Sequence, residues 1–451
     1  MLRRSLPAID WGRPPGVLGY PVKCSVEGRL YEICGQDRLR DQSSCAGMSR
    51  PRNVTLIVDS LGPGGAERVI STMGNYWARR GWRVVLLTME PPGSPPFYEL
   101  DPAIIHRHVH FEVKGLPGLL RRGQNIVRRH RMLRREILAS APDIVISFLT
   151  MPNIGTVLAA RGMDAPIIIS ERCIPTLEPL PWAWRLLRRL TYRRADCLVA
   201  QTQRVLSYFA AAVQARACVI PNPVAVPEAT DSSSEARERR AERRVLAMGR
   251  LGCEKGFDSS IAAFAQVARR HPDWTLEIWG EGPERARLEA QAAATGLGSR
   301  IRLPGQTREP YRVMRQSDLF VLSSQFEGFP NVLCEAMACG LPVISFDCPC
   351  GPREIISDGL DGVLVPAGDA SALATAMSRL MGDGRQRARL GARAQEVRER
   401  YSLERIMALW ESLIDRLLEG RAEGRRRRSS AGAGSCAGPS RQSRPTARPL
   451  R

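Results

Sequence analysis

The sequence predicts an α/β protein with two Rossmann-like domains, and three observations support this fold class. The chain has 451 residues, of which 43% are hydrophobic, so it is too long for one ordinary core. Apolar runs typical of buried strands precede helix-compatible segments, first at 54–61 and again at 245–251. Within 319–346, two such runs flank one helix-compatible segment, the pattern of a βαβ unit in a parallel sheet. Ligands in such sheets bind where strands end and helices begin.

The first domain is expected over residues 48–225. A helix is predicted at 66–80, closed by Gly81. The strands predicted for this domain are 54–61, 83–88, 143–148, 167–170, 198–202 and 218–220. Residues 1–47 show no sustained periodicity, so we expect a disordered or wrongly assigned N-terminal extension, with Met48 as a hypothetical true start.

The second domain is expected over residues 245–400, after a charged, Ser-rich linker at 226–244. Its predicted strands are 245–251, 275–279, 301–305, 319–322, 343–346 and 363–366. A last helix is expected at 401–420. From 421 to 451 the chain is rich in Arg, Ala, Gly, Ser and Pro, which predicts a disordered basic tail.

The composition limits the cellular compartments and the cofactors that are expected for this protein. No apolar run approaches the roughly 18 residues that span a bilayer, and no signal peptide is evident, so a cytoplasmic protein is expected. The 12 cysteines show no zinc-like pairs and are expected to be reduced structural thiols. We therefore expect no metal site and no cofactor.

The formal net charge of +20 suggests an anionic partner. Two segments, 116–139 and 180–194, combine arginines with leucines at helical spacing, and the second adds Trp182 and Trp184. Each could be a plain solvated face or a site for an anionic membrane surface or lipid diphosphate. A nucleic-acid partner is not expected, because only 6% of the residues are aromatic and no stacking motif is present.

The chemistry is expected at three stretches of the second domain. Arg250 and Lys255 stand five residues apart on one strand-to-helix loop, so both cations could converge on one diphosphate. Glu327 lies in the loop before a predicted helix, and Glu335 lies within that helix. Backbone N–H groups at such a helix start bind anions, and a nearby carboxylate could accept bonds from sugar hydroxyls. The alternative is that the two carboxylates simply favour the front of a helix and that the two cations are unrelated surface charges.

These stretches resemble a known family. Glu327-Gly-Phe-Pro-Asn, Glu335-Ala-Met-Ala-Cys-Gly, Gly351-Pro-Arg-Glu and Gly249-Arg-Leu with Lys255-Gly256 are similar to the motifs of family-four retaining glycosyltransferases, which have the glycosyltransferase-B fold. The resemblance covers about residues 52–420. It implies two Rossmann-like domains facing each other across a cleft, with Glu327 at the donor sugar, Glu335 at the ribose, and Arg250 and Lys255 at the diphosphate. In the fold that the resemblance implies, the helix at 401–420 crosses back to the first domain.

The resemblance also implies further site residues. Those expected to bind the donor are Gly65, Gly280, Gly282, Pro304, Gly305, Gly328, Phe329, Pro330, Asn331 and Val332. Those expected to bind the acceptor are Gly64, Asn153, Glu171 and Arg172, and Ser170-Glu171-Arg172 is similar to a motif of bacterial members that act on polyprenyl-diphosphate-linked sugars. Many members carry a histidine near residues 150–153, which this sequence lacks.

The implied function is hexosyl transfer from a nucleotide diphosphate sugar, with UDP as the expected nucleotide, to a lipid-linked glycan with retained anomeric configuration and without a metal. The enzyme is expected on the inner face of the cytoplasmic membrane. Two alternatives share the fold: a nucleotide-sugar epimerase and a non-catalytic nucleotide-sugar-binding protein. We see no catalytic histidine or acid for an epimerase, and a binding protein would tolerate the loss of Glu327, Arg250 or Lys255.

Overall fold

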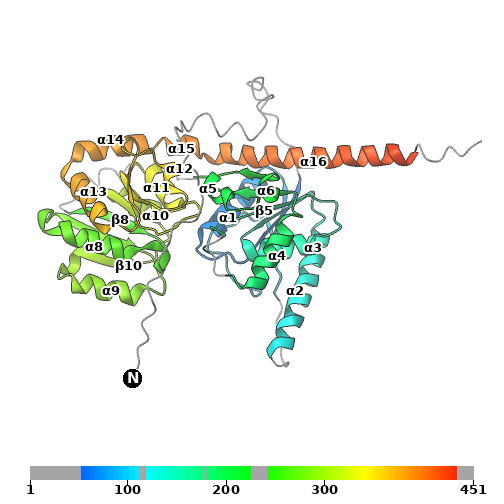
Figure 1. The fold of residues 1–451 in the computed structure, drawn as a ribbon, viewed down its shortest axis with the longest axis horizontal. Helices are drawn as coiled ribbons and strands as arrows, with labels where there is room; N and C mark the ends of the chain where they lie inside the picture. The colour runs from blue at the N-terminus through cyan, green and yellow to red at the C-terminus, as the bar shows by residue number, and fades with distance from the viewer. Residues whose placement is uncertain (1–51, 111–117, 176, 178–179, 225–241, 434–451) are drawn as a thin grey trace, which may run out of the picture. The chain divides into compact units, whose positions relative to one another are not determined.

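The computed structural model describes residues 52–110, 118–175, 177, 180–224 and 242–433 (Figure 1). The expected N-terminal extension, nearly all of the expected linker and the last part of the expected tail lie outside the described residues. The two predicted parallel sheets are present, and helices pack on them (Figure 1). The prediction of an α/β fold with two Rossmann-like domains is therefore confirmed.

The first sheet has seven parallel strands in the order β3-β2-β1-β4-β5-β6-β7. Its strands are β1 (Asn53–Val58), β2 (Arg83–Thr88), β3 (Ile105–His108), β4 (Ile144–Phe148), β5 (Ile167–Ser170), β6 (Cys197–Ala200) and β7 (Ala217–Val219). Val54 pairs with Val84 on one side and with Ile144 on the other, so β1 lies where the strand order reverses. The carboxyl end of β1 is thus a topological switch point, where ligands of such sheets bind.

The helices of the first domain follow its strands. They are α1 (Gly65–Arg79), α2 (Gly118–Ser140), α3 (Thr150–Ala159), α4 (Trp182–Tyr192), α5 (Gln203–Ser207) and α6 (Ala211–Gln214). The two basic segments predicted as amphipathic helices are α2 and α4. The edge strand β3 has no apolar run, and the sequence did not predict it.

The second sheet has six parallel strands in the order β10-β9-β8-β11-β12-β13. Its strands are β8 (Arg243–Met248), β9 (Trp274–Trp279), β10 (Ile301–Gly305), β11 (Leu319–Leu322), β12 (Val343–Asp347) and β13 (Val363–Pro366). β8 lies between β9 and β11, so the order reverses at β8. The helices are α8 (Phe257–Val267), α9 (Arg285–Ala294), α10 (Pro310–Arg315), α11 (Asn331–Ala338), α12 (Pro352–Ile355), α13 (Ala370–Gly382), α14 (Gly384–Ala394) and α15 (Val397–Arg400).

The core strands are apolar on both faces, as in other parallel sheets. On β8, Val245 and Ala247 pack in one buried cluster with α8 and α13, whereas Leu246 packs in another cluster with α10 and α11. This alternation follows the period of two in a strand. It leaves the strand ends as the places where polar side chains gather.

The last helix, α16 (Leu403–Ala433), is longer than expected (Figure 1). Trp410 stacks on Phe148 of β4, with ring centroids 6.3 Å apart. Arg421 donates to Asp196, just before β6, at 2.8 Å. Residues 421–433, which we expected in a disordered tail, are therefore helical. Arg and Ala are strong helix formers, and in this segment they outweigh the two glycines at 424 and 432.

In the part of the chain that the structure describes, no helix is both long and apolar enough to cross a bilayer.

Candidate active site

The loops after β8 and β11 are bound together, and this brings the motif residues of the second domain into contact. Ser323 Oγ donates to the carbonyl oxygen of Lys255 at 3.0 Å, and Gln325 N donates to that of Glu254 at 2.8 Å. Gly256 has a left-handed conformation with φ of 57°, and a Cβ there would lie 2.2 Å from the Ser323 carbonyl oxygen. A glycine at 256 is therefore required for this close approach.

Lys255 and Glu327 form the central ion pair of this edge of the sheet. The Lys255 Nζ lies 2.6 Å from Glu327 Oε1, which also accepts from Ser324 Oγ at 2.7 Å. Burial lowers the pKa of Lys255, but the Glu327 carboxylate outweighs it and the net pKa is raised. The lysine is therefore a fixed positive charge next to a buried carboxylate.

Arg250, the other expected cation of the diphosphate clamp, has a different partner. Its Nη2 lies 2.7 Å from Glu254 Oε1, and its side chain is 67% exposed, against 22% for Lys255. In this state the two cations are held by different carboxylates. Their convergence on one diphosphate stays a prediction, and it would require that the exposed Arg250 side chain reorient and that Lys255 turn from Glu327.

Glu335 of α11 has a cation from the first domain as its partner. Arg68 of α1 places its Nη2 2.5 Å from Glu335 Oε1, and its guanidinium lies 5.8 Å from the centre of the Tyr98 ring. Burial lowers the pKa of Arg68, but Glu335, Tyr311 and Tyr98 together raise it by more, so the net pKa is raised. No sequence signal pairs Arg68 with Glu335, because the two residues are distant in the chain.

Asn331, the first residue of α11, connects the same two helix starts. Its Nδ2 donates to the carbonyl oxygen of Gly65 at 3.3 Å, and its Oδ1 accepts from Asn222 Nδ2 at 2.6 Å. A Cβ at Gly65 would lie 2.8 Å from Asn331 Nδ2. The N-termini of α1 and α11 therefore lie together, and their unpaired N–H groups and helix dipoles favour an anion.

Gly280, Gly282 and Gly305, which were expected to bind the donor, lie where three strand ends pack closely together. A Cβ at Gly280 would lie 1.8 Å from the Gly249 carbonyl oxygen, and a Cβ at Gly282 would lie 2.4 Å from that of Leu251. Gly280 N also donates to the Gly305 carbonyl oxygen at 2.8 Å. These glycines let the ends of β8, β9 and β10 approach closely, so their contact with the donor stays a prediction.

The other expected donor residues lie around the loop before α11. Pro304 is exposed in β10, whereas Phe329 and Pro330 are buried. Gly328 and Val332 are partly buried, and a Cβ at Gly328 would lie 2.5 Å from the Arg172 carbonyl oxygen. Gly64 directly precedes α1, where a Cβ would meet the Glu67 carboxylate at 2.0 Å. The structure thus gathers these residues near the helix starts, with Gly328 against the first domain.

Two expected acceptor residues of the first domain, Asn153 and Glu171, belong to a buried polar network. Glu171 accepts from Tyr192 at 2.7 Å and from Thr150 at 3.0 Å, and Asn153 donates to the Ser170 carbonyl oxygen at 3.0 Å. Burial is the main cause that raises the pKa of Tyr192, and the Glu171 charge adds to it. The side chains of Asn153 and Glu171 have no exposed surface, so direct contact with an acceptor would require this network to open.

Arg172 follows Glu171 and is also buried. Its Nη1 donates to Asn222 Oδ1, and its guanidinium lies 3.7 Å from the centre of the Phe148 ring. Its Nε and Nη2 are buried without a hydrogen-bond partner among the described residues. Burial lowers the pKa of Arg172 to about 9, against the attraction of Glu171. Arg172 and Asn222 thus connect the expected acceptor region to Asn331.

A shallow groove opens between α2, α3 and α4 near the carboxyl ends of β1 and β2. Its walls are mostly apolar, and Asp59, Arg129 and His130 are its charged or titratable members. The apolar side chains that line it include Ile126, Leu133, Ile154, Leu158 and Leu187. Among the described residues, no group of three or more His, Cys, Asp or Glu side chains could hold a metal ion.

Two Rossmann-like sheets with charged side chains gathered at their strand ends are the arrangement in which open α/β proteins bind their ligands. Two family models match consecutive parts of the chain: the Glycosyltransferase Family 4 model over residues 63–226 and the Glycosyl transferases group 1 model over residues 230–397. The chain therefore belongs to the glycosyltransferases that these models describe, as its motifs predicted.

Curated relatives are similar over different shares of their length. An exopolysaccharide phosphotransferase of Streptomyces coelicolor is 35% identical over 301 residues, which is 65% of this chain but 31% of that protein. A Campylobacter jejuni N-acetylgalactosaminyltransferase, whose name gives an undecaprenol-diphosphate-linked glycan as its substrate, is 27% identical over 364 residues, covering 80% of this chain and 98% of the relative.

Solved structures share the fold. Sucrose-phosphate synthase from Thermosynechococcus elongatus has a TM-score of 0.71 at 20% identity, covering 82% of this chain and 100% of the other. Anabaena HepE, in complex with UDP and glucose, has a TM-score of 0.66 at 20% identity, covering 80% of this chain and 99% of the other. At this level of identity the likeness shows the glycosyltransferase-B fold alone.

Proposed function

We propose that the protein is a retaining hexosyltransferase that uses a nucleotide diphosphate sugar, with UDP as the nucleotide, to extend a polyprenyl-diphosphate-linked glycan. The observation that carries the proposal is the Lys255–Glu327 ion pair at the strand ends of the second sheet. A cation and a carboxylate side by side match a donor that carries a diphosphate next to a sugar. The relative from Campylobacter jejuni supports the class of acceptor.

In the proposed mechanism the protein supplies charge and position. Lys255, together with a reoriented Arg250, neutralises the leaving diphosphate, so these cations do the work that a metal ion does in other transferases. Glu327 accepts hydrogen bonds from donor hydroxyls once Lys255 turns to the diphosphate. Glu335 does the same for the ribose. The diphosphate oxygen takes the acceptor proton on the same face of the sugar, which retains the anomeric configuration.

The test of the donor is a thermal-shift panel on the purified full chain with UDP, GDP, ADP and their common sugars, each with EDTA and with magnesium. A ligand that binds only the folded state raises the midpoint according to its saturation. We expect a shift with UDP that does not depend on magnesium. A shift only with magnesium would contradict the proposed role of the two cations, and no shift with any nucleotide would favour a binding protein of another kind.

The acceptor proposal includes a membrane surface, and helix α4 is its main support. Trp182, Leu186 and Leu190 follow one another at a spacing of four residues and are 72%, 49% and 47% exposed. They form one outward apolar stripe, and Arg185 and Arg189 lie next to it on the exposed surface. A helix with exposed tryptophan and leucine beside arginines is typical of the interface of an anionic membrane.

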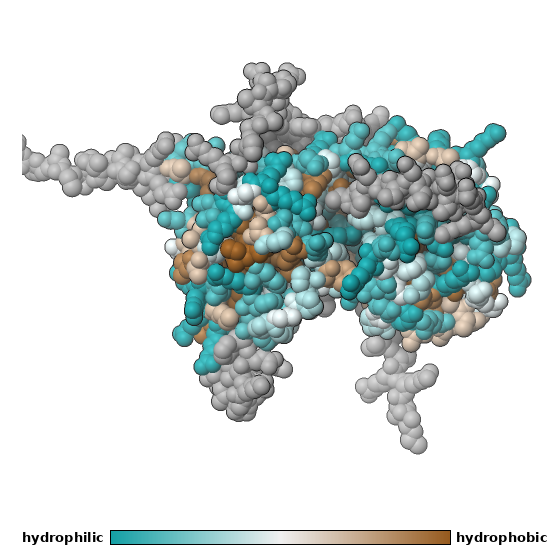
Figure 2. All heavy atoms as spheres, turned by 180° about the vertical axis from the view of Figure 1, so that it is seen from behind, coloured by the Kyte–Doolittle hydropathy of each residue, from teal (hydrophilic) through white to brown (hydrophobic). Residues whose placement is uncertain are grey.

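The rest of the surface is compatible with this assignment. Ile126 and Val127 of α2 are also exposed and lie at or beside the groove between α2, α3 and α4. Figure 2, which views the molecule from behind, also shows a patch of brown hydrophobic side chains bordered by teal hydrophilic ones, and this patch is not assigned to α4. Contiguous apolar surface of this kind marks interaction sites more often than chance exposure.

Flotation with vesicles that contain anionic lipid tests the membrane surface. We expect the full chain to float, and Leu186→Glu together with Leu190→Glu to abolish flotation while the UDP-induced thermal shift persists. Leu360→Glu is the matched control, because Leu360 is exposed to a similar extent on the second domain. Flotation that survives the α4 substitutions would refute the assignment to this helix.

A further inference from the structure

The Gly351-Pro-Arg-Glu stretch has no role in the proposed function, but it packs on the loop over residues 327–331, which we call the donor loop. Gly351 directly precedes α12 and has a φ of 92°. A Cβ at Gly351 would lie 2.6 Å from Pro330 Cδ and 3.6 Å from Glu327 Cβ. A glycine is required for this approach in this conformation, so α12 begins in direct contact with the donor loop.

The backbone of α12 is also bonded to the segment that leads into α16. Tyr401 Oη donates to the Glu354 carbonyl oxygen at 3.3 Å, and Arg400 Nη1 donates to that of Ile355 at 2.9 Å. The Tyr401 ring packs edge-to-face on Phe329 of the donor loop, with ring centroids 5.5 Å apart. These contacts fix the point from which the Glu354 side chain extends.

The Glu354 carboxylate reaches the first domain. Its Oε2 accepts from Gln203 N at 3.0 Å, and its Oε1 accepts from Arg204 N at 3.1 Å, at the start of α5. The Thr202 hydroxyl accepts from the next N–H group, that of Val205, at 3.1 Å. The first three N–H groups of α5, which a helix leaves without partners inside itself, are therefore all bonded, two of them by the other domain.

The contact between Glu354 and α5 combines a gain and a cost. A carboxylate at a helix start is favoured by the helix dipole and by charge-assisted hydrogen bonds. Burial raises the pKa of Glu354, against the lowering effect of the bonds from Arg204 N and Gln203 N, so removal of the carboxylate from water offsets part of the gain. A contact of this kind can form and open, as two domains that admit a substrate and release a product require.

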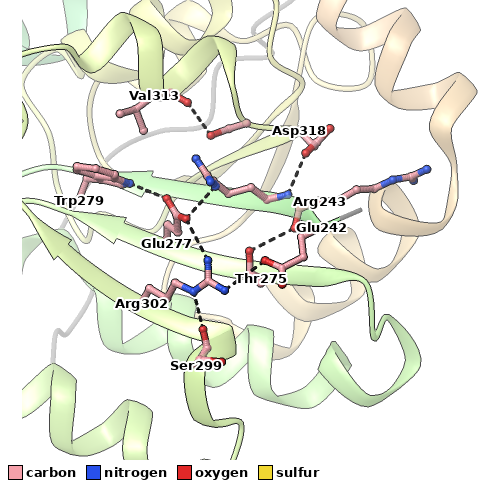
Figure 3. Close-up of polar contacts among 11 residues, drawn as sticks. Glu242, Arg243, Thr275, Glu277, Trp279, Ser299, Arg302, Val313 and Asp318 are labelled. Atoms are coloured by element: carbon pink, nitrogen blue, oxygen red, sulfur yellow. Dashed lines mark hydrogen bonds and ion pairs between the residues drawn. The ribbon is translucent and has the colours of Figure 1, made fainter. Parts of the chain in front are cut away.

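Another buried carboxylate of the second domain has its partners in its own sheet. Glu277 of β9 is 4% exposed, and its Oε1 lies 2.9 Å from Arg244 Nε and 3.8 Å from Arg302 Nη1 (Figure 3). Its Oε2 accepts from Trp279 Nε1 at 2.9 Å (Figure 3). Glu277 therefore stabilises one domain, whereas Glu354 joins two.

The connection between β6 and α5, which Glu354 holds, also contacts the donor loop. Gln201 directly follows β6, and a Cβ at Gly328 would lie 2.9 Å from Gln201 Oε1 and 2.5 Å from the Arg172 carbonyl oxygen. The ends of β5 and β6 thus lie directly against the donor loop at Gly328. Contacts at Gly328 and at Glu354 together restrict the rotation of the two domains as well as their separation.

We propose that Glu354 is a positioning residue that docks the first domain on the donor loop, so that the acceptor is presented to the donor sugar in the geometry that transfer requires. This inference rests on the proposed function. Glu354 acts through the start of α5. Because Lys255, Glu327 and Glu335 all lie in the second domain, loss of the contact with α5 lowers turnover while the nucleotide still binds.

Hydrogen exchange of the full chain, measured by mass spectrometry of its peptides, tests the contact without requiring activity. In Glu354→Ala, residues 202–207 of the first domain are expected to exchange several-fold faster than in the unaltered protein. Asp369→Ala is the matched control, because Asp369 Oδ1 accepts from Ser371 N at 3.0 Å and from Ala372 N at 2.9 Å within its own domain. It is expected to speed exchange only near α13. Unchanged exchange at 202–207 in Glu354→Ala would overturn the contact.

Steady-state turnover with the donor that the thermal-shift panel identifies tests the positioning role. We expect Glu354→Ala to lower kcat by about tenfold or more, as misplaced reactants do, and to leave the Kd for UDP within about twofold by calorimetry. Asp369→Ala is expected to keep both values. A comparable loss of UDP affinity in Glu354→Ala would assign the effect to the donor loop itself. That result, or normal turnover, would overturn the positioning role.

Gln203→Pro removes one of the two donors from the first-domain side. Proline is tolerated at the first position of a helix, and Thr202 already has the extended backbone, with φ of −142° and ψ of 156°, that a residue before proline adopts. We expect a smaller loss of kcat than in Glu354→Ala, and no further loss in the double variant, because both substitutions act on one contact. Additive losses would overturn this assignment.

Failure of the proposed function has a different signature. An unaltered protein that neither binds a nucleotide nor transfers a sugar would overturn the proposed function and, with it, the positioning role. The contact between Glu354 and α5 would still be confirmed or refuted by hydrogen exchange.

Discussion

Two buried carboxylates, one on each sheet, have opposite kinds of partners. Glu327 in the second domain is paired with the cation Lys255, and the neighbouring Arg250 is mostly exposed. Glu171 in the first domain is fully buried and bonded to the neutral hydroxyls of Thr150 and Tyr192. Both lie beyond the carboxyl end of a parallel strand, and both carry a role implied by the family motifs.

This difference in partners indicates that a polar side chain at a strand end has a different role in each domain. An ion pair near the surface can exchange its partner, so an anionic ligand can take Lys255 and leave Glu327 free for hydroxyl groups. A carboxylate that neutral donors satisfy inside the protein has no such exchange available. Glu171 therefore fixes α3 and α4 against the sheet, since Thr150 begins α3 and Tyr192 ends α4. The structure favours a ligand role in the second domain and a positioning role in the first.

The largest effect expected from this comparison is on catalysis. Lys255→Ala removes the cation proposed to stabilise the leaving diphosphate, which is expected to raise the barrier by about 3 to 4 kcal/mol and to lower the turnover rate by a factor of about 100 or more. The measurement is release of the nucleotide diphosphate from the donor identified by thermal shift, with an acceptor of the proposed class.

Arg421→Ala is the matched control for loss of a cation. Arg421 forms an ion pair with Asp196 at 2.8 Å, at the amino end of β6 and therefore at the opposite edge of the sheet from the expected ligand site. We expect near-normal turnover and a change in unfolding free energy of at most about 1 kcal/mol. Near-normal turnover by Lys255→Ala would contradict a ligand role for the Lys255–Glu327 pair. The proposed difference between the two domains would then lose its support from the second domain.

Local sequence patterns were sufficient for most of the fold. Strands such as Ile167–Ser170 and Leu319–Leu322 were predicted with their observed bounds, because apolar runs between turn residues describe buried parallel strands well. The edge strand Ile105–His108 was not predicted, because His106, Arg107 and His108 give no apolar run. The sequence prediction was also wrong beyond residue 420, where α16 continues as a helix. The low apolar content of that segment was taken as a sign of disorder.

The partners of the site residues could not be predicted in the same way. The residue types at 250, 255, 327 and 335 were recognised from motifs, but the contact of Glu335 with Arg68 joins residues that are distant in the sequence. The same holds for Tyr192 with Glu171, and for Glu277 with Arg302. A charged residue inside a strand has no local signal for its role, because its partners come from neighbouring strands.

The smaller effect expected from the comparison is on stability. Tyr192→Phe removes the bond that Tyr192 donates to the buried Glu171 carboxylate and the longer bond that it accepts from Asn153 Nδ2. The bond to the charged group is the larger of the two and contributes about 1.5 to 3 kcal/mol. We expect the free energy of unfolding to fall by that amount in urea denaturation. The affinity for UDP is expected to stay normal, because Tyr192 lies in the first domain and contacts Asn153 and Glu171 rather than the diphosphate loop.

Tyr76→Phe is the control that shows how much stability is lost when a tyrosine hydroxyl without a recorded partner is removed. The Tyr76 ring lies 4.5 Å from the Arg80 guanidinium on the surface of α1, and no hydrogen bond of its hydroxyl is recorded among the described residues. We therefore expect its free energy of unfolding to stay within about 0.5 kcal/mol of the unaltered protein. If Tyr192→Phe instead keeps full stability but loses acceptor turnover, then the network opens to bind acceptor. The strand ends next to Glu171 and Glu327 would then both be ligand sites. A carboxylate bonded to neutral donors, such as Glu171, would exchange its partners as readily as the Lys255–Glu327 ion pair.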